Sequence, residues 1–320
     1  MGRRSSRNVS LALLSPRFRS SILKSMTNEI VIGIDGSDES KVALGWGADE
    51  AMTRGVAAIA VNAWRFPTAG YFGGLTLPDP HESEGYAKRM VDDFVSAERV
   101  RRPGLVISGQ TCEGHPVRNL IDLSADASLV VVGARGSGGF IHAVLGSVSS
   151  ALLLHSHCPV AIVRSSDDSS SRASTGTIVV GVDDSDHAGE ALDWAIGEAR
   201  ARGARLRIVG VWTYPLVYGG PEGAIPPMGF QDMSGEMETM LKALVAERSE
   251  AVGDLDVTTV VHEGACAPIL LDEAERADLL VVGSRGRGGF KGLLLGSVSR
   301  HCAYHSPCPV IIVRKPENPE

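Results

Sequence analysis

The chain contains the same pattern twice, and this internal duplication constrains its fold more than any other feature. The segment from Ile30 reads IVIGIDGSDESKVALGWGADEA, and the segment from Ile178 reads IVVGVDDSDHAGEALDWAIGEA. Further along, LVVVGARGSGGFIHAVLGSVS from Leu129 matches LLVVGSRGRGGFKGLLLGSVS from Leu279, and each copy closes with CPV and a short apolar run. A copy of about 150 residues is long enough to bury a core of its own. The chain is therefore predicted to hold two similar domains in tandem.

Changes in composition set the domain boundaries. Residues 1–26 are rich in Arg and Ser and contain no acidic residue, which predicts a disordered N-terminal extension. Alternatively, this stretch is an organellar transit peptide, or translation starts at Met26. Residues 165–176 read SSDDSSSRASTG and are typical of a flexible linker. We therefore expect domain 1 over residues 27–164 and domain 2 over residues 177–315.

The overall composition excludes several classes of protein. Apolar residues make up 43% of the chain, which is too many for wholesale disorder. No apolar run approaches the roughly 18 residues that a membrane-spanning helix needs. The net charge of −7 argues against binding nucleic acid through a basic surface. Five cysteines in so long a chain do not suggest a disulfide-stapled secreted protein, so we expect a reducing, cytoplasmic location.

Apolar strand patterns alternate with helical patterns in each copy. In the first copy we expect strands at Ile30–Ile34, Val56–Ala63, Leu105–Thr111, Leu129–Gly133 and Val160–Arg164. Helices are expected after Ser37 or Asp38, around Tyr86–Arg101 and Val117–Ala125, and from Ser147, with a Gly/Pro-rich loop from Phe66 to about Glu82. Strands that are apolar along their whole length suit a parallel sheet covered on both faces. The predicted fold class is α/β, with two tandem open parallel five-stranded sheets and helices on both faces.

A glycine-rich loop follows the fourth strand of each copy. The first contains Gly133, Gly136, Gly138 and Gly139 and ends at Gly146-Ser147; the second contains Gly283, Gly286, Gly288 and Gly289 and ends at Gly296-Ser297. Glycine permits close approach of the backbone and positive φ, so such a loop can turn several N–H groups toward one anion. The following helix adds free N–H donors, and the hydroxyls of Ser147 and Ser149 add others. The expected ligand is a compact polyanion such as a nucleotide.

Two other phosphate-binding motifs do not fit. A Walker loop needs a lysine that neither copy supplies. A dinucleotide fingerprint needs G-x-G-x-x-G after the first strand, but Ile141 occupies the place of its last glycine, and the loop follows the fourth strand. No metal site is expected either, because His155, His157 and Cys158 lack convincing zinc spacing and Pro307 replaces His157 in the second copy.

The two copies resemble the universal stress protein family in its tandem-domain form. The family motif G-x2-G-x9-G-[ST] is matched by Gly133, Gly136, Gly146 and Ser147, and again by Gly283, Gly286, Gly296 and Ser297. The aspartates after the first strands, Asp35 and Asp183, and the closing CPV strands at Cys158 and Cys308 are similar too. The resemblance implies the family's five-stranded, Rossmann-like sheet and binding of ATP, with Mg²⁺ on the phosphate oxygens. It implies aspartates near the ribose and phosphates, and adenine at the backbone of Ala63 and Val211. The implied cofactor-binding residues also include Val148, Ser149, Val298 and Ser299.

The resulting hypothesis is an ATP-binding regulator of stress response and growth, without an assigned catalytic residue. Two alternatives stay open: a slow ATPase or phosphotransferase, and a nucleotide-free scaffold of paired domains. The glycine loops could serve strand-to-helix packing alone, and the aspartates could be turn residues or helix caps. Family behaviour implies that Val160–Arg164 pairs with Val310–Arg314 within the chain, and a homodimer is a further expectation. Unequal sites are also expected, because Arg287 replaces Ser137 and Asp184 replaces Gly36.

Overall fold

The computed structural model describes residues 28–65, 80–136, 145–165, 174–213, 232–287 and 293–314. The predicted extension over residues 1–26 lies outside these ranges, as do residues 166–173 of the predicted linker and Lys315. Within the described ranges, strands and helices alternate along both halves of the chain, as the sequence pattern predicts. None of the helices found there is both long and apolar enough to cross a membrane.

The two halves repeat one series of elements. The first half contains β1 (Glu29–Gly33), α2 (Asp38–Arg54), β2 (Ala58–Trp64), α3 (Pro80–Arg101), β3 (Ile107–Glu113), α4 (Pro116–Ser124), β4 (Ala127–Gly133), α5 (Ser147–His155) and β5 (Val160–Val163). The second contains β6 (Thr177–Gly181), α6 (Asp186–Arg202), β7 (Arg205–Trp212), α7 (Met233–Glu247), α8 (Ser249–Val252), β8 (Val257–Glu263), α9 (Cys266–Ala274), β9 (Leu279–Gly283), α10 (Ser297–His305) and β10 (Val310–Val313). Helix α3 begins at Pro80, so the loop expected to reach Glu82 ends earlier than the sequence suggested.

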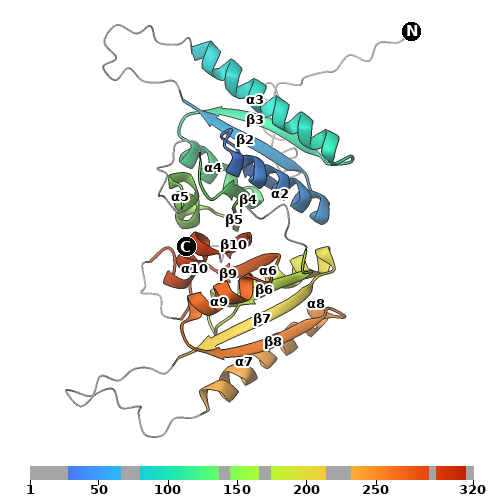
Figure 1. Cartoon of the computed structure of the whole chain (residues 1–320), viewed down its shortest axis with the longest axis vertical. Helices are drawn as coiled ribbons and strands as arrows, with labels where there is room; N and C mark the ends of the chain where they lie inside the picture. Colours follow the sequence, from blue (N-terminus) through green and yellow to red (C-terminus); the bar gives the residue numbers. More distant parts are fainter. Residues whose placement is uncertain are drawn as a thin grey trace, which may run out of the picture.

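The ten strands in the described part of the chain belong to one sheet, in the order β3-β2-β1-β4-β5-β10-β9-β6-β7-β8 (Figure 1). Within each half every pair of neighbouring strands is parallel. The halves meet at the centre, where β5 and β10 run antiparallel with Val310 opposite Ile162 and Ile312 opposite Val160. The two expected five-stranded sheets are therefore continuous with each other.

The helix that follows the first strand of each half is bounded by side-chain and glycine signals. Ser37 caps α2 by accepting a hydrogen bond from the Ser40 N–H, and Gly55 ends the helix with a φ of 64°. In the second half, Ser185 and Gly203 occupy the same places, and Gly203 has a φ of 61°. The caps at Ser37 and Ser185 set where α2 and α6 begin, just after the carboxyl ends of β1 and β6, where the candidate sites lie.

The sheet has an apolar layer on each face, and successive strand residues alternate between the two layers. Ile30 and Ile32 of β1 pack on the face covered by α2, α3, α6 and α7, whereas Val31 packs on the opposite face. That opposite face is covered by α4, α5, α9 and α10. Each layer contains buried residues of both halves, so the halves share a core across the β5–β10 junction.

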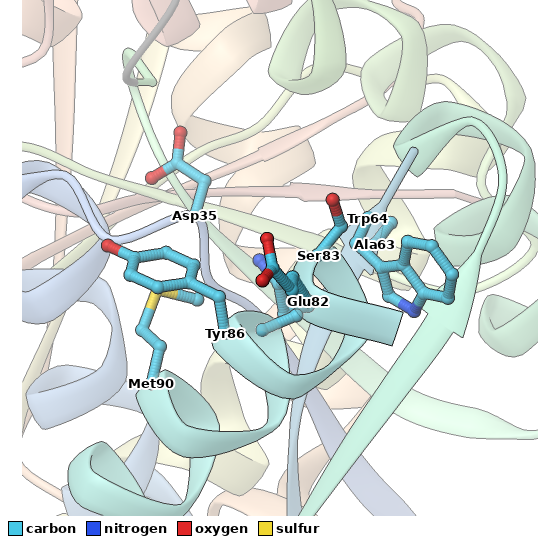
Figure 2. A pocket seen from close by; sticks show the side chains of 9 residues that line it. Asp35, Ala63, Trp64, Glu82, Ser83, Tyr86 and Met90 are labelled. Carbon is cyan, nitrogen blue, oxygen red and sulfur yellow. The ribbon is translucent and has the colours of Figure 1, made fainter. Parts of the chain in front are cut away.

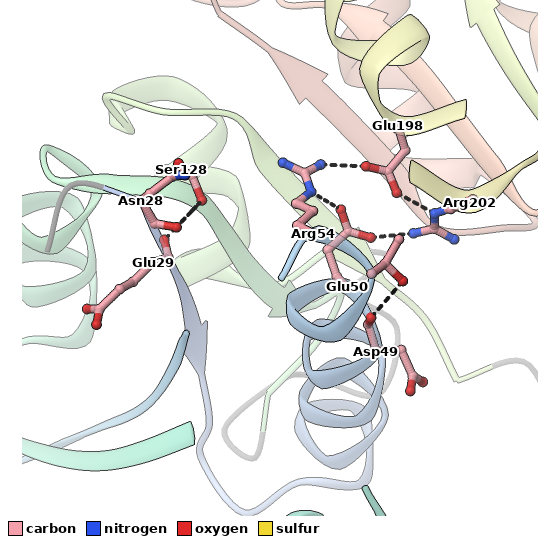
Figure 3. A network of polar contacts seen from close by, with 9 residues as sticks. Asn28, Glu29, Asp49, Glu50, Arg54, Ser128, Glu198 and Arg202 are labelled. Atoms are coloured by element: carbon pink, nitrogen blue, oxygen red, sulfur yellow. Dashed lines mark hydrogen bonds and ion pairs between the residues drawn. The ribbon is translucent and has the colours of Figure 1, made fainter. Parts of the chain in front are cut away.

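Helices α2 and α6 are joined by four alternating charges, Glu50, Arg54, Glu198 and Arg202 (Figure 3). Each carboxylate contacts both guanidinium groups, and Arg54 Nη2 lies 2.7 Å from Glu198 Oε2. The two carboxylates are almost completely buried. Each arginine also lies over a tryptophan of the other half: Arg54 is 4.5 Å from the centre of the Trp194 ring. We call these four charges the α2–α6 charge cluster.

Candidate functional site

The first half contains a cavity of about 430 Å³ at the carboxyl edge of the sheet (Figure 2). It lies between the ends of β1 and β2 and the start of α3. In open parallel sheets, ligands bind beyond the carboxyl ends of the strands. Two of the predicted residues, Asp35 and Ala63, line it together. The complete lining is Asp35, Asn62, Ala63, Trp64, Glu82, Ser83, Tyr86, Ala87 and Met90.

Asp35 lies between the end of β1 and the glycine loop. Its Oδ1 accepts hydrogen bonds from the backbone N–H and the hydroxyl of Ser37, at 3.0 and 2.6 Å. Its Oδ2 faces Gly136, where an added Cβ would lie only 2.5 Å away. Any side chain at Gly136 would therefore displace this carboxylate. Asp35 does act as a turn residue, one of the two interpretations left open, and it also lines the cavity.

The second half repeats this contact. Asp183 Oδ1 accepts hydrogen bonds from the backbone N–H of Ser185, at 3.0 Å, and from its hydroxyl. Its Oδ2 accepts the backbone N–H of Arg287 at 2.9 Å, and a Cβ at Gly286 would lie 2.6 Å from the same oxygen. The aspartate thus ties the glycine loop to the end of β6.

Glycine was considered for these loops because it permits both close approach of the backbone and positive φ, and the loop glycines that the structure describes do not use positive φ. Positive φ occurs at other glycines, including Gly36 with a φ of 87° after β1. The loop glycines with ordinary φ are Gly133, Gly136, Gly146, Gly283, Gly286 and Gly296. Close approach explains several of these positions instead. Gly138, Gly139, Gly288 and Gly289 lie outside the described residues.

Gly133 and Gly283 allow a helix to approach the end of the fourth strand. A Cβ at Gly133 would lie 3.0 Å from the backbone of Glu39 in α2, and one at Gly283 would lie 2.5 Å from the His187 carbonyl oxygen. Such contacts leave no room for a side chain. These two glycines therefore have a packing role whether or not a ligand binds.

Ser149 and Ser299 are buried within this packing. The Ser149 hydroxyl donates to the carbonyl oxygen of Gly133 at 2.7 Å, and the Ser299 hydroxyl donates to that of Gly283 at 2.6 Å. A hydroxyl has one proton to donate, and here the fold uses it. By contrast, Ser147 and Ser297 are exposed at the first positions of α5 and α10.

The N-termini of α5 and α10 lack the side-chain caps found on α2 and α6. Their N-cap residues, Gly146 and Gly296, make no side-chain hydrogen bond to the helix. The Gly146 N–H instead donates to the Ala134 carbonyl oxygen at 2.7 Å, which closes the loop on itself. The next N–H groups belong to Ser147 and Val148, and to Ser297 and Val298 in the second half. An uncapped helix start of this kind is suited to bind an anion.

Charged side chains around the two loops differ between the halves. Arg135 donates to Glu39 Oε1 at 2.7 Å, and Glu39 Oε2 accepts the Ser165 N–H at 3.2 Å. In the second half, Arg287 Nε lies 3.0 Å from Asp184 Oδ1. The two replacements from which unequal sites were expected, Arg287 and Asp184, therefore form an ion pair with each other.

Two cysteines, Cys266 at the start of α9 and Cys158 before β5, are poor nucleophiles. Cys266 is the first residue of α9, and burial together with the negative charge of Asp183 raises the pKa of its thiol to about 11. Burial raises the pKa of Cys158 to about 11 as well. Both stay protonated near neutral pH, which favours the interpretation of Cys158 as a small buried residue over a redox sensor.

Sequence reasoning missed most of the cavity wall. Asn62 precedes Ala63 in β2, and Glu82, Ser83, Tyr86 and Met90 come from the first turns of α3. In Figure 2, Tyr86 and Met90 project from α3 toward the side of the cavity where Asp35 lies. Tyr86 and Met90 are four residues apart and so lie on one helix face, but that spacing alone does not distinguish a cavity wall from a core stripe.

Comparison with known proteins agrees with the architecture. The family model described as "Universal stress protein family" matches residues 26–164 and 175–314. Universal stress protein Rv1996 of Mycobacterium tuberculosis is 33% identical over 311 residues, covering 91% of this chain and 96% of that protein. A universal stress protein of Mycolicibacterium smegmatis is 35% identical over 296 residues, covering 89% of this chain and 96% of that protein.

A solved structure supports the same fold. The crystal structure of a universal stress protein from Archaeoglobus fulgidus superposes with a TM-score of 0.64 at 22% identity, covering 91% of this chain and 97% of that one. The fold and the repeated loop define a tandem α/β protein with a candidate ligand site in each half. With two family matches that span most of its length, the chain belongs to the universal stress protein family.

Proposed function

We propose that this protein binds ATP in both halves and acts in the cytoplasm as a nucleotide-dependent regulator of stress response and growth. The regulatory part is the family's behaviour, whereas the binding part is supported by the geometry of the chain itself. Each half offers an uncapped helix start beside a loop that lies against the aspartate after the first strand. This repeated arrangement is the observation that carries the proposal.

The loops fit a triphosphate better than they fit a neutral ligand. The exposed Ser147 and Ser297 add hydroxyl donors to the free N–H groups of α5 and α10. The positive end of each helix dipole favours negative charge at the same place. Mg²⁺ would be held mainly by phosphate oxygens, because it keeps most of its waters and needs few protein ligands.

We propose binding without efficient turnover, and Asp183 supports this form of the proposal. Phosphoryl transfer requires a group that positions or deprotonates the nucleophile. Both oxygens of Asp183 already accept hydrogen bonds, from Ser185 and from the Arg287 N–H. Asp183 is therefore better suited to shape the loop than to act as a base.

Two arginines each donate a hydrogen bond to a helix of the opposite half, and these contacts provide a path by which ligand binding in one half can affect the other. Arg314, just after β10, donates through Nη2 to the Leu153 carbonyl oxygen of α5 at 2.6 Å. Arg164, just after β5, donates through Nη2 to the Ala303 carbonyl oxygen of α10 at 2.5 Å. Each helix thus begins at the site of its own half and ends on an arginine of the other. We propose that a ligand-induced shift of α5 or α10 is transmitted along this path.

A homodimer of two chains remains part of the proposal, but it needs a surface other than the closing strands. β5 already pairs with β4 on one side and β10 on the other, and β10 pairs with β9 and β5. Neither strand has an edge left for a second chain.

Calorimetric titration of the full chain with Mg-ATP tests the binding proposal. We expect two sites per chain in the wild type and one site in each of the variants Gly136→Val and Gly286→Val. In each variant the valine side chain would clash with the neighbouring aspartate. Thermal unfolding of the variants without nucleotide serves as the control for folding. No heat of binding and no thermal shift at millimolar ATP would contradict the proposal, and turnover faster than about one per minute would contradict its non-enzymatic form.

A further inference from the structure

Asn62 presents a fixed hydrogen-bond acceptor to the first-half cavity. The side chain is 8% exposed and lines the cavity. Its Nδ2 donates to the Ile34 carbonyl oxygen at 2.8 Å, which sets the orientation of the carboxamide because only the amino end can donate to a carbonyl. In the described part of the chain, Asn62 Oδ1 accepts no hydrogen bond. This oxygen is not completely shielded from solvent, so it is open to the cavity, and a ligand with an N–H group at this place would replace water as its donor.

The second half lacks this acceptor. Gly210 occupies the β7 position that corresponds to Asn62, one residue before Val211. Met237 of α7 occupies the place of Ala87 in α3, and a Cβ on Gly210 would lie 2.9 Å from Met237 Cγ and Sδ. A buried thioether therefore covers the backbone where the first half has a carboxamide. Two paired differences, Asn to Gly in the strand and Ala to Met in the helix, replace a polar wall by an apolar one.

The rest of the first-half wall suits a flat, partly polar ring. Ala87 and Met90 are apolar, and Ser83 and Glu82 add polar groups at the mouth. The aromatic side chain of Tyr86 is 68% exposed, so it is available to contact a ligand. Planar bases are often held between such side chains and a few fixed polar groups. The polar group with the most restricted position in this cavity is Asn62.

We propose that Asn62 selects the base in the first-half site: its Oδ1 accepts a hydrogen bond from the exocyclic amino group of a 6-aminopurine. The second-half site, with Gly210 and Met237, binds nucleotide without this selection. The inference rests on the proposed binding of ATP and adds that the two halves read the base differently. In physical terms, one oriented acceptor in the first half favours a purine with an amino group at position 6 over a purine with hydrogen or an oxo group there.

Three triphosphates that share ribose and phosphates test this claim. ATP carries the 6-amino group, purine riboside triphosphate carries hydrogen there, and ITP carries an oxo group. In the Gly286→Val chain, which keeps the first-half site, ATP should bind about tenfold more tightly than either analogue, the value of one hydrogen bond of about 1.4 kcal/mol. In the Gly136→Val chain, which keeps the second-half site, the three affinities should agree within about twofold. This comparison needs no substitution at Asn62.

Asn62→Leu then assigns the selection to one side chain. In the Gly286→Val chain it should weaken ATP to the level of the two analogues and leave their affinities almost unchanged. In the Gly136→Val chain it should change nothing, which controls for an effect through folding. If ATP binds the first-half site but no better than the analogues, or if Asn62→Leu leaves the preference intact, this inference is wrong while the proposed function stands. If none of the three binds the wild-type chain, the proposed function itself is wrong.

Discussion

The two halves of the molecule share a backbone plan and differ in the side chains that face a ligand. In both, an aspartate after the first strand faces a loop glycine at almost the same distance, 2.5 Å to a Cβ at Gly136 and 2.6 Å at Gly286. The cavity wall behind this contact differs, with Asn62 beside Ala87 in one half and Gly210 beneath Met237 in the other. The contact between the aspartate and the loop glycine is thus the same in both halves, whereas the side chains that would contact the base have diverged.

The turn that follows the first strand also differs between the halves. After β1 the chain turns at Gly36 with a φ of 87°, a conformation that residues with a side chain rarely adopt. After β6 the equivalent residue is Asp184, which has no positive φ and pairs with Arg287. One half therefore has a glycine turn with positive φ at this place, and the other has an ion pair between two exposed side chains. The halves differ in local charge distribution without any change in the sheet.

The largest expected effect concerns the contact between the halves. Removing one carboxylate from the α2–α6 charge cluster, by Glu50→Ala or Glu198→Ala, leaves a partly buried excess positive charge. Each variant should lose about 3 kcal/mol of unfolding free energy. Because each carboxylate contacts both arginines, the two losses should be equal within about 1 kcal/mol. Urea unfolding measures both, with the exposed-carboxylate variant Glu238→Ala as the control. A large loss for one and none for the other would show that the halves do not contribute equally to the cluster.

The next effect separates the two sites. Gly136→Val should weaken nucleotide binding to the first half about a hundredfold, and Gly286→Val should do the same in the second, because each forces an overpacked contact of about 2–3 kcal/mol. Calorimetry counts the remaining sites. Loss of both sites in either variant would mean that the halves bind as one unit rather than separately.

A smaller effect is expected from transplanting the first-half wall into the second half. The double change Gly210→Asn with Met237→Ala should give the second-half site about a tenfold preference for ATP over purine riboside triphosphate. Competition binding in the Gly136→Val background measures it. Gly210→Asn alone is the matched control and should destabilise the fold, because its side chain meets Met237. A double variant that folds and binds but shows no preference would argue that the base is read elsewhere.

The smallest effect is a dependence of the second half on pH. Hydrogen bonding to Arg207, with a further contribution from His262, lowers the pKa of Glu273 below its ordinary value of 4.5. The stabilisation is therefore fully present above pH 4.5 and is lost as the pH falls through the lower, folded-state value. The first half has Leu123 at this position and no such dependence from it. Because these groups are partly exposed, the loss should stay below about 1 kcal/mol.

Hydrogen exchange of β8 and α9 at pH 6 and pH 3.5, compared with the Glu273→Gln variant, measures this effect. The variant should be less stable at pH 6 and should show a weaker dependence on pH. Equal dependence in both proteins would exclude Glu273 as its source.

The sequence predicted the aspartate and the spaced glycines of the site better than it predicted the residues that line the cavity. Asp35 and the glycine spacing could be recognised because a duplicated motif between a strand and a helix has few structural solutions. The loop glycines were expected to allow close approach to a ligand, whereas Gly133 and Gly136 also allow close contacts with Glu39 and Asp35 of the chain itself. Such contacts join residues about a hundred positions apart, and a local pattern carries no information about them.

The remaining features depend on packing between distant segments. Ser149 was expected to donate to phosphate, but its position in the first turn of α5 turns its hydroxyl toward the Gly133 carbonyl oxygen. Asn62 reads as a polar interruption near the end of an apolar strand, and only the place of α3 shows that it lines a cavity. The hydrogen bonds of Arg164 and Arg314 to opposite helices likewise follow from the antiparallel junction of β5 and β10.

If each half holds one adenine nucleotide, denaturing the freshly purified full chain should release it, and chromatography can quantify what is released. We expect close to two equivalents of adenine nucleotide per chain, falling to about one in Gly136→Val or Gly286→Val and to none when both are changed. Release of no nucleotide from wild-type protein, together with no uptake after incubation with millimolar Mg-ATP, would contradict it.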